Sequence, residues 1–155
     1  MPLLTLAELR GLLTKDQRLL GIDPGSKTIG LALSDVRLTL ASPFGSLRRS
    51  KLKANAAEIA AIARRESVGG LVIGLPLSMD GSAGPAAQSA TDWALALSEA
   101  TGLPTSMFDE RLSSTAANRL LISEADLSRR KRAASVDRLA ASWILQAALD
   151  ASRAA

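Results

Sequence analysis

The sequence predicts an α/β domain in which helices cover both faces of a mixed β-sheet. The first third of the chain contains short apolar runs separated by turn residues, and the remainder alternates helical and strand-like segments. A meander followed by such an alternation is typical of a mixed sheet between helices. Of the 155 residues, 47% are hydrophobic but only 3% are aromatic. We therefore expect one domain with an aliphatic core.

An amphipathic helix is expected at the start of the chain. Thr5 and Glu8 have the spacing of a capping box, and Leu6, Leu9 and Leu13 recur at helical intervals. This helix either packs on the domain or frays from it. We therefore expect a helical extension over residues 1–18 and the domain itself over residues 19–155.

Five segments have the composition of strands. An apolar run ends at Asp23, passes a Pro24-Gly25 turn and continues as an alternating run to Ser34, and a third short strand is expected at 43–47. The nearly continuous apolar run at 71–76 is typical of the buried centre of a sheet, and a last strand is expected at 105–108. We expect the first strand to be central in the sheet.

Helical patterns separate and follow the last strands. Apolar stripes predict helices at 52–66 and 85–101, and Ser113 or Ser114 can cap a further helix that includes Ala117, Leu120 and Leu121. The final helix is expected to begin near Ser135, and its apolar stripe consists of Val136, Leu139, Ala140, Trp143, Ile144 and Ala147.

Several classes of chemistry are excluded by composition. The chain has no cysteine and no histidine, so disulfides, thiolate nucleophiles, the usual zinc sites and imidazole catalysis are all absent. Any metal must be bound by oxygen atoms, which favours Mg²⁺ or Mn²⁺. No segment approaches the roughly 20 apolar residues of a membrane span, and Glu8 and Arg10 interrupt the N-terminal leucines. We expect a cytoplasmic protein without a membrane partner.

Positive charge is concentrated in two places. The net charge is +4, and one basic cluster spans 48–53. The second, expected in a loop before the final helix, consists of Arg129, Arg130, Lys131 and Arg132. Such clusters suit a phosphate backbone, although a solvated loop would explain either cluster equally well.

Acidic residues occur where the predicted strands end. Asp23 ends the first strand, Asp109 and Glu110 end the last one, and Asp137 opens the final helix. Convergence of these acids would require a divalent cation, because clustered carboxylates repel one another. Two such ions can activate water for attack on a phosphodiester. Structural alternatives remain open: Asp23 can organise the turn, and Asp137 can favour the helix dipole if Ser135 is the N-cap.

Two further features lie beside these acids. Lys27 and Arg111 are candidate phosphate contacts, although each can simply neutralise its neighbour. The segment 74–82 opens from a strand into a loop rich in glycine and serine, a place where such sheets bind ligands. It can equally be only a turn before the next helix.

Four motifs occur together in order: GIDPGSKTIG at 21–30, GLPLSMDGS at 74–82, DERLSS at 109–114 and VDRLAA at 136–141. Together they resemble the YqgF family, also called RuvX, over residues 19–150. These small bacterial proteins are described as Holliday-junction resolvases and as nucleases that mature the 5′ end of 16S ribosomal RNA. The resemblance implies a five-stranded ribonuclease H-like fold and metal-dependent cleavage of nucleic acid.

The resemblance also implies roles for the acids. Asp23 would be the metal ligand on the first strand, Asp109 and Glu110 would supply the acid of the later strand, and Asp137 would be the carboxylate on the helix. Neighbours on a strand point to opposite faces, so the choice between Asp109 and Glu110 stays open. Family members often have lysine before the Val-Asp pair, where this chain has Ser135. A phosphate contact is then either lost at this position or supplied by the basic cluster 129–132.

Two other functions are compatible with parts of the sequence. The turn at 23–28 is similar to the phosphate loop of actin-like sugar kinases, but those enzymes need two lobes, which 155 residues cannot provide. A nucleic-acid adaptor without catalysis is the main alternative. The choice between precursor rRNA and branched DNA as substrate, and between monomer and homodimer, stays open.

Overall fold

The computed structural model describes residues 3–77, 80–115 and 129–153, and for residues 129–138 it describes the backbone. It contains a five-stranded sheet in the order β3-β2-β1-β4-β5. The strands are β1 (Arg18–Pro24), β2 (Thr28–Ser34), β3 (Ala41–Arg48), β4 (Val68–Leu75) and β5 (Thr105–Asp109). The first three are antiparallel neighbours, and β4 and β5 run parallel to β1. The predicted mixed sheet with a central first strand is confirmed.

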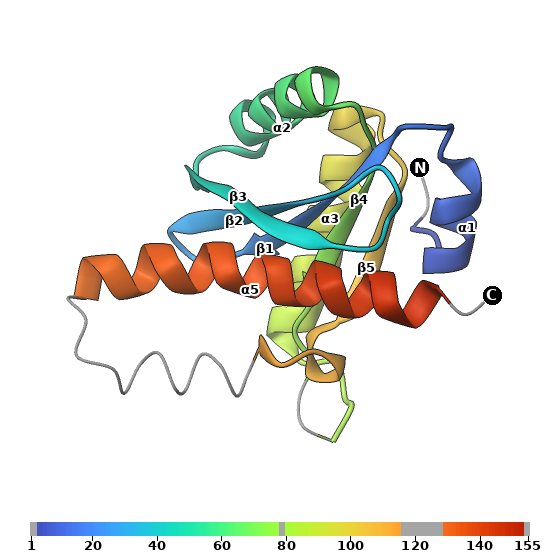
Figure 1. The fold of residues 1–155 in the computed structure, drawn as a ribbon. Helices are drawn as coiled ribbons and strands as arrows, with labels where there is room; N and C mark the ends of the chain where they lie inside the picture. Colours follow the sequence, from blue (N-terminus) through green and yellow to red (C-terminus); the bar gives the residue numbers. More distant parts are fainter. Residues whose placement is uncertain (1–2, 78–79, 116–128, 154–155) are drawn as a thin grey trace.

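Helices cover both faces of this sheet (Figure 1). Helices α2 (Leu52–Glu66) and α3 (Pro85–Thr101) pack on one face, and α5 (Arg129–Ser152) crosses the other. Each face has its own aliphatic cluster, with Ile59 and Leu97 on the first and Ile144 and Leu145 on the second. Within the described part of the chain, no helix is long and apolar enough to cross a membrane.

The N-terminal helix α1 (Leu6–Leu12) packs on the domain rather than fraying. Thr5 and Glu8 form both hydrogen bonds of the predicted capping box. Leu9 is fully buried, and a Cβ placed on Gly70 would lie 2.5 Å from its Cδ1 atom. The bare backbone of β4 therefore lets α1 approach the sheet closely.

Helix α5 corrects two predictions. It begins at Arg129, whereas the sequence analysis expected a start near Ser135, and the cluster 129–132 therefore forms helical backbone and not a loop. Arginine, lysine and alanine are good helix formers, so nothing in this segment stops the helix from extending backwards. The helix expected to include Ala117, Leu120 and Leu121 lies outside the described residues.

The buried face of α5 also differs from the predicted stripe. Ala140 and Ile144 are buried as expected, but Trp143 is only partly buried. The remaining buried apolar side chains are those of Ala141, Leu145, Ala148 and Leu149. The stripe is wide because the helix lies flat on a sheet and needs a broader apolar face than a single row of side chains.

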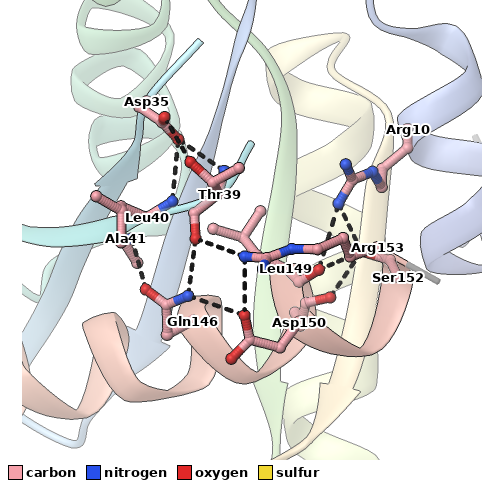
Figure 2. A network of polar contacts seen from close by, with 11 residues as sticks. Arg10, Asp35, Thr39, Leu40, Ala41, Gln146, Leu149, Asp150, Ser152 and Arg153 are labelled. Carbon is pink, nitrogen blue, oxygen red and sulfur yellow. Dashed lines mark hydrogen bonds and ion pairs between the residues drawn. The ribbon is translucent and has the colours of Figure 1, made fainter. Parts of the chain in front are cut away.

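Polar contacts fasten the C-terminal half of α5 to its neighbours (Figure 2). The Gln146 amide accepts a hydrogen bond from the backbone of Ala41 and donates one to the carbonyl of Thr39, both at 2.9 Å. Arg10 of α1 donates to the Ser152 hydroxyl at 2.9 Å. These contacts join the C-terminal half of α5 to the β2–β3 connection and to α1.

Candidate active site

Asp23 lies at the end of the central strand and is only 4% exposed. The parallel register places Ile22 beside Ile73 of β4, and Gly74 beside Phe108 of β5. The carboxyl ends of β1, β4 and β5 therefore meet at one edge of the sheet, which brings Asp23, Gly74 and the acids after β5 together. Loops at such an edge are the usual location of ligand sites in α/β proteins.

Gly74 lies close to two carboxylates. A Cβ atom on this residue would be 3.9 Å from Oδ1 of Asp23 and 3.7 Å from Oε2 of Glu110. The same atom would be 2.8 Å from Cδ1 of Ile144 on α5, closer than real Cβ contacts allow. Glycine therefore leaves the space next to Asp23 and Glu110 unfilled while α5 packs against the strand.

A pocket of about 390 Å³ opens at this edge. Asp23, Gly74 and Glu110 line it together with Arg49 and Trp93. Its walls come from the β1–β2 turn, the end of β3, the end of β4 and the first turns of α3. A pocket of this size with a few convergent polar groups is typical of a small-ligand or substrate site.

Asp109 and Glu110 have different surroundings although they are adjacent. The Asp109 carboxylate accepts hydrogen bonds from Nε and Nη2 of Arg111, at 3.0 and 2.6 Å, and another from the Arg111 backbone at 3.0 Å. The side-chain hydrogen bond from Arg111 is the largest cause that lowers the pKa of Asp109. Glu110 lines the pocket, whereas Asp109 is not among the described residues that do.

Arg111 neutralises Asp109, one of the two alternatives left open by the sequence. Its guanidinium also lies against the loop after β4, with Nη1 3.4 Å from where a Cβ of Gly81 would be. Gly81 has a φ of +87°, a conformation that favours glycine. Asp80 and Ser82 are joined across this turn by hydrogen bonds at 2.7 and 2.9 Å. Part of the predicted ligand loop is therefore an ordered turn held against Arg111.

Lys27 is exposed in the β1–β2 turn and is not among the described pocket residues. Its carbonyl accepts a hydrogen bond at 2.8 Å from the backbone of Arg49, and it is Arg49 that lines the pocket. In the sequence, Arg49 is only one member of the basic cluster 48–53. Among the described residues, Trp93 is the one aromatic side chain that lines the pocket. The sequence could not place Trp93 beside Arg49, because Arg49 follows β3 and Trp93 lies on α3.

Asp137 belongs to α5, but its side chain lies outside the described residues, as do those of the cluster 129–132. The backbone still tests one alternative. Because α5 begins at Arg129, Asp137 is well beyond the first turn and Ser135 is not an N-cap. The helix-dipole explanation for Asp137 was therefore wrong, since that effect fades within the first turn.

Among the described residues, no group of three acidic side chains is close enough to hold a metal ion. The pair formed by Asp23 and Glu110 nevertheless suits a hard divalent cation, which prefers carboxylate oxygens. Both carboxylates approach one point at Gly74, and both line the same pocket. The donor set of this edge therefore fits Mg²⁺ or Mn²⁺.

Comparisons with known proteins agree with this architecture. A solved structure of RuvC from T. thermophilus in complex with a Holliday junction substrate matches with a TM-score of 0.55. The match covers 90% of this chain and 98% of that chain at 17% identity, and supports the ribonuclease H-like fold. Two curated relatives share the name "Putative pre-16S rRNA nuclease".

The first relative, from Gluconacetobacter diazotrophicus, is 66% identical over 98% of this chain and 99% of its own length. The second, from Gluconobacter oxydans, is 59% identical over 99% of this chain and 96% of its own length. A protein-family model with the description "RuvX: Holliday junction resolvase" matches residues 17–151 of this chain. The chain belongs to the RuvX family.

Proposed function

We propose that this protein is a metal-dependent nuclease that hydrolyses phosphodiester bonds and matures the 5′ end of precursor 16S rRNA in the cytoplasm. One observation carries the chemistry: Asp23 and Glu110 approach each other at Gly74, inside a pocket that Arg49 also lines. The two carboxylates suit a divalent cation, and the positively charged guanidinium in the same pocket suits an anionic substrate.

Asp23 and Glu110 are the proposed metal ligands, and Asp137 is proposed as the third. When bound, Mg²⁺ or Mn²⁺ lowers the pKa of water and stabilises the charge that develops on the leaving oxygen. Asp109 is proposed to act differently: its carboxylate holds Arg111 and so orients the turn that presents Glu110. Under this proposal Glu110, which lines the pocket, binds the metal, and Asp109 does not.

The high identity of the rRNA-nuclease relatives over nearly the whole chain favours RNA as the substrate. The description of the family model favours a four-way DNA junction instead. The deciding experiment offers the purified protein a precursor 16S rRNA leader and a DNA junction at equal concentration with Mn²⁺. We expect faster cleavage of the RNA, and preferred cleavage of the junction would reverse the substrate assignment.

A variant separates catalysis from binding. Glu110→Gln should reduce cleavage at least about 100-fold while leaving RNA binding in EDTA within about threefold, because one anionic ligand is lost from a pocket that keeps its shape. Glu99→Gln, on the exposed surface of α3, is the control. If neither the wild type nor any variant cleaves but all bind RNA, the protein is an adaptor and the nuclease proposal is wrong.

A further inference from the structure

Arg49 is held in one orientation at the pocket. Nη1 of its guanidinium donates a hydrogen bond at 2.8 Å to the carbonyl of Gly25, two residues after Asp23. Its Cζ atom lies over the ring of Trp93, 5.4 Å from the centroid. The backbone amide of Arg49 is also bound, to the carbonyl of Lys27. A long side chain fixed in this way loses little conformational freedom when it binds a ligand.

The guanidinium has donors to spare. Of its five N–H groups, the bond to Gly25 uses one, and no other hydrogen-bond acceptor for this side chain is found in the described part of the chain. Arg49 is partly buried, and it faces the pocket that Asp23 and Glu110 also line. An oriented guanidinium with open donors beside a pocket is well suited to a phosphate, which accepts paired hydrogen bonds from it.

The neighbouring end of α3 favours the same ligand. Ala86, Ser89 and Ala90 of its first turns line the pocket. The N-cap, Gly84, provides no side-chain cap, so the first amides of this 17-residue helix have no side-chain acceptor from that position. Helix N-termini of this kind attract anions. Arg49 and α3 thus contribute positive potential to a pocket whose other wall is acidic.

We propose that Arg49 binds a phosphate of the substrate strand in this pocket, and that Trp93 and Gly25 position its guanidinium. The proposal rests on the proposed nuclease function, because the ligand is a phosphodiester of the nucleic acid to be cleaved. An anionic strand approaching two carboxylates meets repulsion, and Arg49 offsets it next to the reacting group. This role is distinct from the cluster 129–132, which lies on another element.

The first test compares Arg49→Gln with Arg37→Gln. Both remove one positive charge, but Arg37 is exposed on the β2–β3 connection, at the other end of these strands. With the RNA leader and Mn²⁺, Arg49→Gln should raise KM about tenfold and change kcat less than about threefold, because it removes a ground-state contact to the strand. Arg37→Gln should change neither by more than about twofold. An unchanged KM for Arg49→Gln would overturn the proposal.

A second measurement does not need catalysis. Replacing Trp143, a partly buried residue of α5, by Phe leaves Trp93 as the only tryptophan. In EDTA, a single-stranded RNA oligonucleotide should change the fluorescence of Trp93 in Trp143→Phe. Adding Arg49→Gln should abolish most of this change and reduce the salt slope by about 0.7, the value for one phosphate contact on a single strand. Equal fluorescence changes and salt slopes with and without Arg49 would refute the proposal.

Arg49→Lys is a second variant for the case that Arg49→Gln lowers the melting temperature. It keeps the positive charge at this position. Its KM should fall between those of the wild type and Arg49→Gln, since lysine binds phosphate without the planar fork. A KM no better than that of Arg49→Gln in a folded protein would contradict a phosphate contact. If RNA binding depends on Arg49 but no variant cleaves RNA, the nuclease function fails and the phosphate site stands.

Discussion

The two ends of the β1–β2 pair each have an aspartate, and the two residues are used differently. Asp35 follows β2 and accepts hydrogen bonds from the backbone of Thr39 and Leu40, at 2.8 and 3.0 Å, and from the Thr39 hydroxyl at 2.8 Å (Figure 2). Asp23, at the opposite end, is more deeply buried and faces the pocket beside Glu110. Asp35 therefore stabilises the β2–β3 connection, whereas Asp23 lies near a second carboxylate, that of Glu110, in the pocket.

This contrast shows that a carboxylate at a strand end is not by itself a functional site. Asp35 and Asp109 are both occupied by donors from their own connection, and in both cases those donors lower the pKa. Asp23 lies on β1 and Glu110 in the turn after β5, and both carboxylates lie close to Gly74 of β4. Local pairing identifies structural acids, whereas long-range convergence on a pocket identifies the acids to test for catalysis.

The largest expected effect comes from exchanging the two aspartates for asparagine. Asp23→Asn should reduce Mn²⁺-dependent cleavage at least about 100-fold, because a neutral amide replaces an anionic ligand of similar shape. Asp35→Asn should keep wild-type turnover. The measurement compares the initial cleavage rates of both variants and the wild type on the RNA leader, and circular dichroism verifies that each variant is folded. Near-normal turnover of folded Asp23→Asn would mean that Asp23 is no more important for catalysis than Asp35.

Asp137→Asn should follow closely in magnitude, with a fall in activity of about 100-fold and a melting temperature within about 2 °C of the wild type. The small stability change is expected because the residue lies beyond the first turn of α5, where the dipole contributes little. Differential scanning calorimetry and cleavage rates are measured on the same sample. Full activity would return Asp137 to a structural role and leave the pocket with two acids.

Gly74→Ala tests the open space between the carboxylates. Its Cβ would lie 3.9 Å from Oδ1 of Asp23 and 3.7 Å from Oε2 of Glu110, and would press on Cδ1 of Ile144. We expect activity to fall about tenfold and stability by about 1–3 kcal/mol, as is usual for an overpacked core. Gly45→Ala is the matched control, because apart from its two chain neighbours no atom of the described residues lies within 4 Å of its added Cβ.

The double variant Gly74→Ala, Ile144→Val separates the two effects of that methyl group. Valine lacks the Cδ1 atom that the new Cβ would strike, so the double variant should recover stability. The methyl group still occupies the space between the acids, so activity should stay low. If the double variant recovers both stability and activity, Gly74 is needed only for the packing of the strand against Ile144.

The smallest effect concerns stability at the far end of the sheet. Burial by itself would raise the pKa of Asp35, but hydrogen bonds from Leu40 and Thr39 outweigh it and lower the pKa to about 2. A lowered pKa stabilises the fold above the ordinary value of 3.8, and this contribution is lost as the pH falls toward 2. Asp35→Asn should cost about 1 kcal/mol at pH 7, and thermal unfolding should show the difference shrinking below pH 4. A pH-independent difference would contradict this account.

Much of the fold followed from local patterns. The capping box at Thr5 and the alternating run after Gly25 led to the correct helix and strand, because they are short-range effects of backbone geometry. The start of α5 was missed because a basic run has no helix breaker and reads equally well as a loop or a helix. Its buried face was shifted because packing on a sheet decides which side chains are covered.

The sequence by itself determined the strand that ends in Asp23, the acids after the last strand, the absence of histidine and cysteine chemistry, and the family motifs. Each of these depends on neighbouring residues or on composition. Only the tertiary structure decided that Glu110, and not Asp109, is among the described residues of the pocket, that both Asp23 and Glu110 lie close to Gly74, and that Arg49 lies over Trp93. These are contacts between elements far apart in the chain, and they exist only because the register of the sheet and the packing of α3 and α5 bring those elements to one edge.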